Sequence, residues 1–391
     1  MKKASKNKTF LSEIGQNIKN LDKFLLVLIV IFAAFGLVVV FSSSNITAVL
    51  SYHKEPTFFF KKQLIFTVVG IFGMLFTAIC VPKSTYKYLA GLLFFGLIVM
   101  FFLKRSMSSI NDANSWATFN GQSFQPSEFA KTFVIMFMAL IYGGNRYYKK
   151  WWYAFIPLSV CLLLMILIAR EPDFGTAGVI GFIVMLIFLA LPIKSPIIKI
   201  LRISAVLIGI AGLVGIYVFQ PEFISRENTT RQESRFAFTE PCSRSLAKTG
   251  YQVCNAYIAI NNGGLWGRGF GQSTQKFLYL PEAFTDFVFP IVIEEIGLVG
   301  SSIVLIAYVV LLTKILIIAR HATNLCDSII AFGTFSYILV HIFINLGGVL
   351  ALIPMTGIPL PFLSYGGSFL LNLFVLLGLT LRVSVNNKRF A

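Results

Sequence analysis

Carboxylates that stand beside long apolar runs are the residues of this chain best suited to chemistry. The sequence has 16 Asp and Glu residues in 391, and an ionisable side chain near a hydrophobic segment usually faces a cavity or a charged partner. In a cavity, a carboxylate can act as a general base toward a hydroxyl group. Seven of the acids stand in this setting: Glu128, Glu171, Asp173, Glu282, Asp286, Glu294 and Glu295.

Two short motifs give some of these acids a structural interpretation beside the functional one. In "QPSEFAK", Glu128 and Lys131 are three residues apart and share one helical face, where they either form an ion pair at a helix end or line a polar cavity. In "REPDFGTA", Pro172 permits a helix to begin and Asp173 can cap it. At the level of sequence, both interpretations of each motif stay open.

Three further features could bind a substrate. The stretch "NNGGLWGRGFGQS" lacks the spacing of a nucleotide-binding loop, but its backbone N–H groups, with Arg268 and Lys276, could contact a pyrophosphate. Trp116 is either a membrane-interface anchor or a flat platform for a sugar or lipid. Ser364 in "PLPFLSYGGS" forms no G-x-S-x-G elbow, which favours a re-entrant loop built by Pro and Gly over a serine hydrolase.

The elements that must position these residues are membrane-spanning helices. Hydrophobic residues make up 57% of the chain and charged residues 13%, and the mean hydropathy is +0.80. Apolar runs of about 20 residues, the length that crosses a bilayer core, recur along the sequence. The pattern predicts an all-α polytopic membrane protein with ten transmembrane helices: 24–43, 63–82, 86–103, 126–143, 153–169, 176–192, 203–219, 295–318, 328–350 and 367–384.

The distribution of positive charge predicts how the chain is oriented. The formal net charge is +17, but no basic stripe is interleaved with exposed aromatics, so we do not expect nucleic-acid binding. Lys and Arg gather in alternate connections, which indicates that both termini are cytoplasmic. Residues 1–23 are then a basic cytoplasmic segment without the features of a secretory signal, 24–384 a transmembrane domain with a large extracellular loop at 220–286 between helices 7 and 8, and 385–391 a cytoplasmic tail.

The length of the apolar run after the large loop places its acids. From Phe287 to Ile318 a helix would be about 48 Å long, whereas the hydrocarbon core is about 30 Å thick. The part from Gly297 onward is enough to cross. We therefore expect Asp286, Glu294 and Glu295 at the outer boundary of the membrane, or lining a cavity that is open to it.

The five cysteines predict no metal site. The chain has no C-x-x-C pair, and its three His residues are scattered, so a structural zinc site is not expected. Cys80, Cys161 and Cys326 fall in or near spans. Cys242 and Cys254 share the outer loop, where a disulfide between them is one of two open possibilities.

Several of these stretches, in this order and at these spans, carry a family resemblance. They are "NSWATFNGQSFQPSEFAK", "REPDFGTA", "GYQVCNAYIAINNGGLWGRGFGQSTQKFLYLPEAFTDFVFPIVIEEIGLVG" and "IPMTGIPLPFLSYGGS". Together they resemble the SEDS family of shape, elongation, division and sporulation proteins, typified by FtsW and RodA. The resemblance covers residues 24 to 384, and "GQSTQKFLYLPEA" is closer to the FtsW branch.

The resemblance implies a fold and an activity. The family fold has ten transmembrane helices and a large outer loop between the seventh and eighth. Its activity is a peptidoglycan glycosyltransferase reaction, the polymerisation of lipid II into glycan strands at the outer face of the bacterial cytoplasmic membrane. The FtsW branch implies septal synthesis in cell division. The implied partners are lipid II, a glycan on undecaprenyl pyrophosphate, a class B penicillin-binding protein that acts as transpeptidase, and other divisome proteins.

The resemblance also implies roles for individual residues. Its essential aspartate corresponds to Asp286, the candidate general base, and its essential tryptophan to Trp116. The positions that line its polar cavity correspond to Gln125, Ser127, Glu128 and Lys131. Its other substrate-binding positions correspond to Lys62, which opens the second span, to Asp173 and to Ser364. Together with Lys62 and Lys131, the loop residues Arg268 and Lys276 are candidates to offset the charge of a leaving pyrophosphate, and a divalent cation, Mg²⁺ or Mn²⁺, could assist. No organic cofactor is expected.

The chain departs from the family pattern at two positions. Phe284 stands where the family usually has His, which argues against an imidazole base at that position, and "NDANSW" lacks the usual Arg before the tryptophan, which removes one expected phosphate contact.

Two other functions stay open. A lipid II flippase would use the same cavity. An ion-coupled transporter would need acids at the bilayer midplane, whereas the acids here cluster at the ends of spans.

Overall fold

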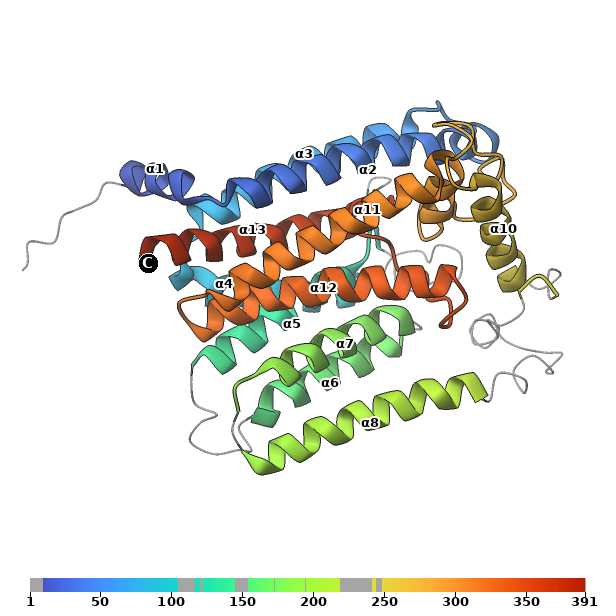
Figure 1. Cartoon of the computed structure of the whole chain (residues 1–391). Helices are drawn as coiled ribbons and strands as arrows, with labels where there is room; N and C mark the ends of the chain where they lie inside the picture. The colour runs from blue at the N-terminus through green and yellow to red at the C-terminus, as the bar shows by residue number, and fades with distance from the viewer. Residues whose placement is uncertain are drawn as a thin grey trace, which may run out of the picture.

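The computed structural model describes residues 10–104, 117–119, 122–144, 154–171, 173–193, 195–218, 241–243 and 248–390. Long helices run side by side in it, and α10 lies across one end of the bundle (Figure 1). The helices are α1 (Phe10–Asn20), α2 (Lys23–Leu50), α3 (Phe58–Cys80), α4 (Tyr86–Lys104), α5 (Pro126–Gly143), α6 (Phe155–Ala169), α7 (Phe174–Ala190), α8 (Pro196–Val218), α10 (Lys248–Gly263), α11 (Val288–Arg320), α12 (Leu325–Val349) and α13 (Gly367–Phe390). A 3-10 turn, η1 (Lys83–Thr85), precedes α4.

A short hairpin is the one departure from the predicted all-helical class among the described residues. Strands β1 (Ala117–Phe119) and β2 (Gln122–Phe124) pair antiparallel, with Ala117 opposite Phe124. The hairpin leads directly into α5. Hydropathy did not predict it, because a three-residue strand carries no periodic pattern long enough to recognise.

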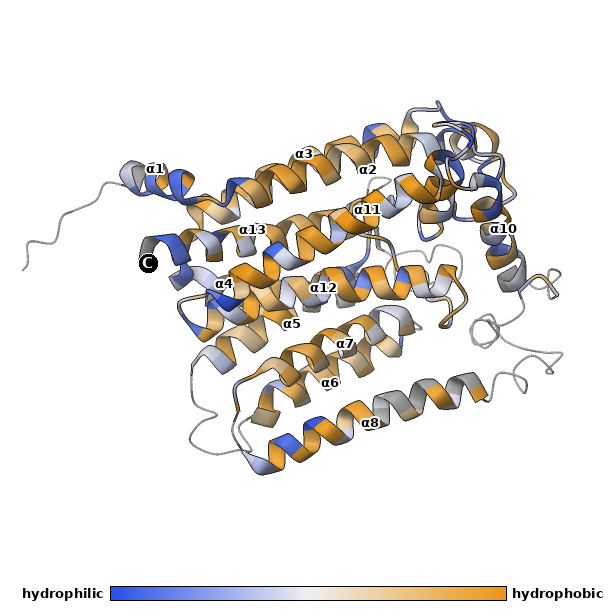
Figure 2. Ribbon diagram, viewed as in Figure 1, coloured by the Kyte–Doolittle hydropathy of each residue, from blue (hydrophilic) through white to orange (hydrophobic). Residues whose placement is uncertain are grey.

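Apolar side chains on the outside of the bundle indicate a lipid environment. In the described residues, α2, α3, α11, α12 and α13 are long and apolar enough to cross a membrane, while α6 and α7 are apolar but shorter. Along most helices the middle turns are hydrophobic and the polar residues lie toward the ends (Figure 2). Large side chains such as Phe72 and Phe76 of α3 are 71% and 62% exposed. The chain is therefore a multi-pass membrane protein.

The core of the bundle is built around α13 and α12. Helix α13 packs against α3, α12 and α5, and α12 packs against α5, α7 and α11. Most of α13 is buried, including Leu373, Phe374 and Leu377. A helix that is apolar on all sides and enclosed by others occupies the centre of a membrane bundle, so α13 and α12 are the scaffold from which the polar side chains project.

Local capping explains where several helices begin. Asp22 accepts a hydrogen bond from the Leu25 amide (3.0 Å) at the start of α2, and Asn324 accepts one from the Asp327 amide (3.0 Å) at the start of α12. Helix α5 opens with Pro126 in its first turn. Each device satisfies or avoids a backbone N–H that the first helical turn leaves without a partner.

Helix α11 is broken at Gly297. This residue has φ 73° and ψ 178°, a conformation that is essentially restricted to glycine. A Cβ added there would overlap the Leu265 carbonyl oxygen. The second part of α11, from Leu298 to Arg320, is about 35 Å long and is sufficient to cross the hydrocarbon core.

The loop after α10 binds the backbone groups that the break releases. Arg268 N donates to Glu294 O (2.9 Å) and Gly269 N to Glu295 O (3.0 Å), while Leu298 N donates to Gly264 O (3.0 Å). Helix α10 itself ends at Gly263 within the run "NNGG", as expected because glycine commonly ends a helix. The Gly-rich loop therefore completes the hydrogen bonding of a discontinuous helix, as irregular backbone in a membrane protein requires.

The connection between α12 and α13 is non-helical and is held by side chains from several helices. Asn345 Nδ2 of α12 donates to Ile358 O (2.8 Å), and Gln63 Nε2 of α3 donates to Ser364 O (3.2 Å). The hydroxyl of Tyr308 in α11 donates to Pro361 O. Non-helical backbone inside a membrane protein is tolerated when its polar groups are satisfied in this way.

A disulfide joins Cys242 to Cys254 of α10. Of the two possibilities that the sequence left open for this pair, the structure shows the bonded one. The bond ties the described part of the large loop to the end of the bundle at which α11 begins.

Candidate functional site

The Asp286 carboxylate projects from a tight turn immediately before α11. Both Thr285 N and Phe287 N donate to Glu282 O at 3.2 Å, and Glu282 has a positive φ of 55°. The Thr285 hydroxyl lies 2.9 Å from Asp286 Oδ1. The turn fixes Asp286 at the end of the bundle, and its side chain is only half-buried.

Helix α12 and the connection that follows it hold Asp286 from the other side. Asn345 Nδ2 donates to Asp286 O (2.8 Å) as well as to Ile358 O (2.8 Å). Gly357 has φ 71°, and a Cβ there would lie 3.5 Å from Asp286 Oδ2. These residues line a small pocket of about 10 Å³, room for about one water molecule. Asn345 is thus a residue of the site that sequence reasoning missed, since a lone Asn inside an apolar run gave no signal of its partner.

Phe284 packs in an aromatic cluster beside this turn. Its ring centroid is 4.7 Å from that of Phe59 and 5.7 Å from that of Tyr365, and it is 6% exposed. Tyr365 N also donates to Phe284 O (2.8 Å). At the position where the resembled family usually has His, this chain therefore uses an apolar ring to join the Asp286 turn to α3 and to the connection before α13.

Asp173 links α5 to α7. It caps α7 by accepting from Thr176 N (3.2 Å), and its other oxygen accepts from Gln125 Nε2 and Ser127 Oγ, both at 2.8 Å. The structure therefore brings together three of the residues that the sequence analysis selected. The cap interpretation of Asp173 is confirmed, and the same carboxylate also binds the polar start of α5.

A buried polar cluster joins α5 to α12. Lys131 Nζ donates to Glu128 Oε1 (2.7 Å), and the two side chains are 0% and 3% exposed. Lys131 Nζ also lies 3.3 Å from His341 Nε2, while His341 Nδ1 lies 3.2 Å from Pro359 O. Because an ammonium group only donates, Nε2 accepts and Nδ1 donates to the carbonyl. In the sequence, His341 is one of three scattered histidines, and only the packing of α5 on α12 makes it part of this cluster.

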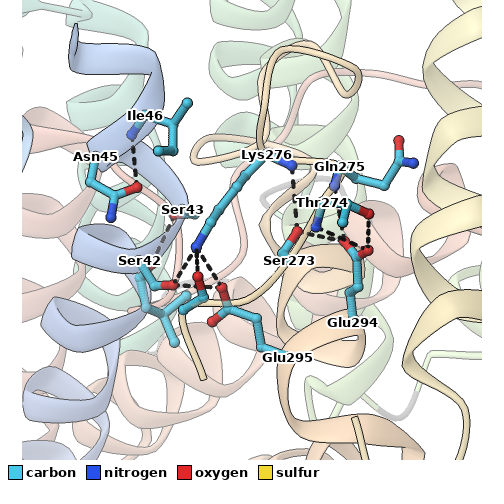
Figure 3. Close-up of polar contacts among 12 residues, drawn as sticks. Ser42, Ser43, Asn45, Ile46, Ser273, Thr274, Gln275, Lys276, Glu294 and Glu295 are labelled. Carbon is cyan, nitrogen blue, oxygen red and sulfur yellow. Dashed lines mark hydrogen bonds and ion pairs between the residues drawn. The ribbon is translucent and has the colours of Figure 1, made fainter. Parts of the chain in front are cut away.

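A second polar network forms where α2, the Gly-rich loop and α11 meet (Figure 3). Lys276 is 1% exposed; its Nζ lies 3.1 Å from Glu295 Oε1 and donates to Gly271 O (2.6 Å). Ser42 Oγ of α2 donates to the same Glu295 oxygen (2.6 Å). The charge of Lys276 is therefore already paired with a buried carboxylate that stands just before the break in α11.

Glu294 organises the rest of this loop. Its carboxylate accepts from Ser273 Oγ (2.5 Å), Thr274 Oγ1 (2.8 Å) and Gln275 N (3.2 Å), and Arg268 lies 3.9 Å away. Figure 3 shows Glu294 turned toward the loop residues Ser273 to Gln275, and Glu295 turned toward Lys276 and Ser42. Glu294 thus has a clear structural task, whereas the Arg268 side chain remains 40% exposed.

Two of the remaining selected residues lie on α3 and on the connection before α13. Lys62 of α3 is half-buried, and its Nζ lies 4.6 Å from the centroid of the Phe58 ring. Ser364 is 1% exposed, and its Oγ accepts from Leu360 N (2.8 Å). Trp116 lies outside the described residues. Within the part of the chain that the structure describes, no three His, Cys, Asp or Glu side chains gather as a metal site would require.

These features define a class of protein: a helical, multi-pass membrane protein with a broken helix, a side-chain-bound connection and carboxylates gathered toward one end of the bundle. The model of the cell cycle protein family FtsW/RodA/SpoVE matches residues 22–389. The chain belongs to this family.

Relatives and a solved structure agree with that assignment. The chain is 36% identical over 378 residues to the probable peptidoglycan glycosyltransferase FtsW of Bacillus subtilis, covering 94% of this chain and 91% of the relative. It is 35% identical over 370 residues to stage V sporulation protein E of Bacillus subtilis, covering 93% and 96%. A chain from a structure described as a peptidoglycan synthase complex that coordinates polymerisation and crosslinking has a TM-score of 0.71 at 22% identity, covering 94% and 98%, and therefore shares the fold.

Proposed function

We propose that this protein is a peptidoglycan glycosyltransferase that polymerises lipid II into glycan strands. The observation that carries the proposal is the Asp286 turn, in which a half-buried carboxylate is fixed between α11, α12 and the connection before α13. Membership of the FtsW/RodA/SpoVE family and the name of the Bacillus subtilis FtsW relative support it. The FtsW relative favours a role in septal synthesis during cell division.

The proposal includes an orientation in the bacterial cytoplasmic membrane. Ten helices span it, both termini are cytoplasmic, and residues 24–384 form the transmembrane domain between an N-terminal segment at 1–23 and a tail at 385–391. The loop at 220–286 and Asp286 then face outward. The excess of Lys and Arg on the opposite side supports this arrangement, and the active face meets lipid II headgroups at the outer surface.

In the proposed reaction Asp286 acts as the general base. It takes the proton from the GlcNAc 4-hydroxyl of lipid II as that oxygen attacks the anomeric carbon of the donor glycan. The bond from this carbon to undecaprenyl pyrophosphate breaks, and the pyrophosphate leaves with the electron pair. Asn345 keeps the Asp286 turn in place because its amide binds the backbone of Asp286, and the positive φ of Gly357 lets the connection before α13 turn beside the carboxylate.

The cations divide into two groups in this proposal. Arg268 and Lys62 are partly exposed and can offset the charge of the leaving pyrophosphate directly. Lys131 and Lys276 are buried in ion pairs and contribute to the polar lining with their partners Glu128 and Glu295. A divalent cation, Mg²⁺ or Mn²⁺, bound with the pyrophosphate would supply further charge stabilisation.

The other selected residues shape the substrate cavity. Gln125, Ser127 and Asp173 form one hydrogen-bonded unit at the start of α5, and Ser364 holds the connection before α13. Trp116 forms a platform for the sugar or the lipid. The partner is a class B penicillin-binding protein, which crosslinks the strands within a larger divisome assembly.

The test is glycan synthesis by the purified chain in detergent, where there is no membrane across which a flippase could move lipid II. We expect polymer from lipid II with the unchanged protein and less than about 1% of that rate with Asp286→Asn. Glu55→Gln is the matched control, because Glu55 is an exposed acid paired with Lys61 on the loop between α2 and α3. Polymer from Asp286→Asn at the rate of the unchanged protein would refute the role of Asp286, and no polymer from the unchanged protein, alone or with its partner, would favour the flippase.

A further inference from the structure

One hydroxyl group stands between two carboxylates in the Asp286 turn. Thr285 Oγ1 lies 2.7 Å from Glu282 Oε2 and 2.9 Å from Asp286 Oδ1. A threonine hydroxyl has one proton to donate and lone pairs with which to accept. It can donate to only one of the two carboxylates at a time, so the second short contact becomes a hydrogen bond when that acid itself carries a proton.

The backbone of Glu282 has a strained conformation. Its φ of 55° lies in the left-handed region, which is unfavourable for a residue with a Cβ and open to glycine. The turn nevertheless fixes it through two amides, Thr285 N and Phe287 N, that donate to Glu282 O. A carboxylate therefore occupies a position where glycine would be less strained, beside the candidate catalytic acid.

The three side chains also form a gradient of exposure. Asp286 and Thr285 are half-buried, whereas Glu282 is exposed to solvent. Tyr52 is one ionisable neighbour of Glu282: partial burial, and then the Glu282 charge, raise the pKa of Tyr52. Glu282 is exposed to solvent and its Oε2 lies against the Thr285 hydroxyl, so it can pass a proton on to water.

We propose that Glu282 and Thr285 form a proton relay that restores Asp286 after each glycosyl transfer. The inference rests on the proposed function, and both residues act through Asp286. Once Asp286 has taken the proton of the attacking hydroxyl, it donates that proton to Thr285 Oγ1 while the Thr285 proton passes to Glu282 Oε2. Glu282 then releases its proton to water. One proton enters and one leaves, and no other bond changes.

The relay is tested with purified protein and lipid II. Glu282→Gln keeps the shape but cannot take up the proton, and Thr285→Val removes the hydroxyl. We expect each to lower kcat at least tenfold, to leave the KM for lipid II within twofold, and to alter the solvent deuterium isotope effect on kcat. Thr285→Ser should recover most of the rate lost in Thr285→Val, and Glu55→Gln should match the unchanged protein.

A glycine substitution separates the relay from a structural role. Glu282→Gly relieves the backbone strain, so we expect thermal stability at least equal to that of the unchanged protein together with the same loss of kcat as in Glu282→Gln. Full activity in Glu282→Gly would overturn the relay. So would a need for more Mg²⁺ in Glu282→Gln to reach the same rate, because these oxygens would then bind a cation instead.

The same experiment distinguishes the two levels of the proposal. If the unchanged protein makes no polymer, the proposed function fails and the relay fails with it. If the unchanged protein is active, Asp286→Asn is inactive and both Glu282→Gln and Thr285→Val keep the full rate, the relay alone is refuted.

Discussion

Removing Lys131 should destabilise the protein far more than removing an exposed lysine that makes an equally short ion pair. Lys131 and Glu128 are 2.7 Å apart and 0% and 3% exposed. Lys131→Met leaves the Glu128 carboxylate buried without its cation, which costs about 3–5 kcal/mol of unfolding free energy, or more than about a hundredfold in the folding equilibrium. Replacing both residues, with Glu128→Gln and Lys131→Met, removes the unpaired charge and should recover most of this loss.

The chain provides its own control for this experiment. Lys61 and Glu55 are 2.6 Å apart, but their side chains are 62% and 72% exposed, so Lys61→Met should leave stability nearly unchanged because water already solvates both charges. The assay is reversible unfolding in mixed detergent micelles for the four proteins of a double-mutant cycle and for Lys61→Met.

Two results would refute this reasoning. One is a cost for Lys131→Met no larger than that for Lys61→Met. The other is a coupling energy between Glu128 and Lys131 below about 0.5 kcal/mol, since residues in one buried network couple by about 0.5–3 kcal/mol. Activity of the double variant is a separate measurement: a stable but inactive protein would show that the substrate cavity needs the charges themselves.

Three further predictions follow from single positions. Gly297→Ala should lower the free energy of unfolding by more than about 3 kcal/mol, because Ala cannot adopt the φ and ψ of Gly297 without strain and its Cβ would overlap a loop carbonyl. Gly96→Ala, where a Cβ meets nothing within 4 Å, is the control in the same unfolding assay. Equal effects of the two substitutions would contradict the account of the break. Replacing Cys242 and Cys254, 12 residues apart, by Ser should lower the free energy of unfolding by about 3 kcal/mol and make α10 more sensitive to proteolysis. An unchanged rate of cleavage would argue against a stabilising bond. Phe284→His should lower the free energy of unfolding by about 1–3 kcal/mol, because it buries a polar ring among aromatics, and it should not raise the polymerisation rate. A faster variant would show that a base at this position can take part in the reaction.

Local features of the fold could be predicted from the sequence because they depend on neighbouring residues. The run "YQVCNAYIAINNGG" predicts a helix with a stop, and α10 ends at Gly263. Asp173 before a new helix predicts a cap, which the structure shows. Spacing by three puts Glu128 and Lys131 on one helical face, and they form the ion pair. The apolar composition and the repeated apolar runs predict the membrane class, because runs of about 20 residues match the thickness of a bilayer core.

The arrangement of the site depends on contacts that sequence spacing does not encode. Ser42 meets Glu295 across 253 residues, Lys131 meets His341 across 210, and Asn345 meets Asp286 across 59. Each contact exists because elements with apolar faces pack together and enclose the few polar atoms that they carry, and these atoms then bind the donor or acceptor opposite them. The sequence by itself therefore determined the class of protein, the Asp173 cap of α7 and the candidate acid Asp286. Only the tertiary structure decided that a serine, an asparagine and a histidine from distant helices complete its polar clusters, because buried polar groups take their partners from three-dimensional packing.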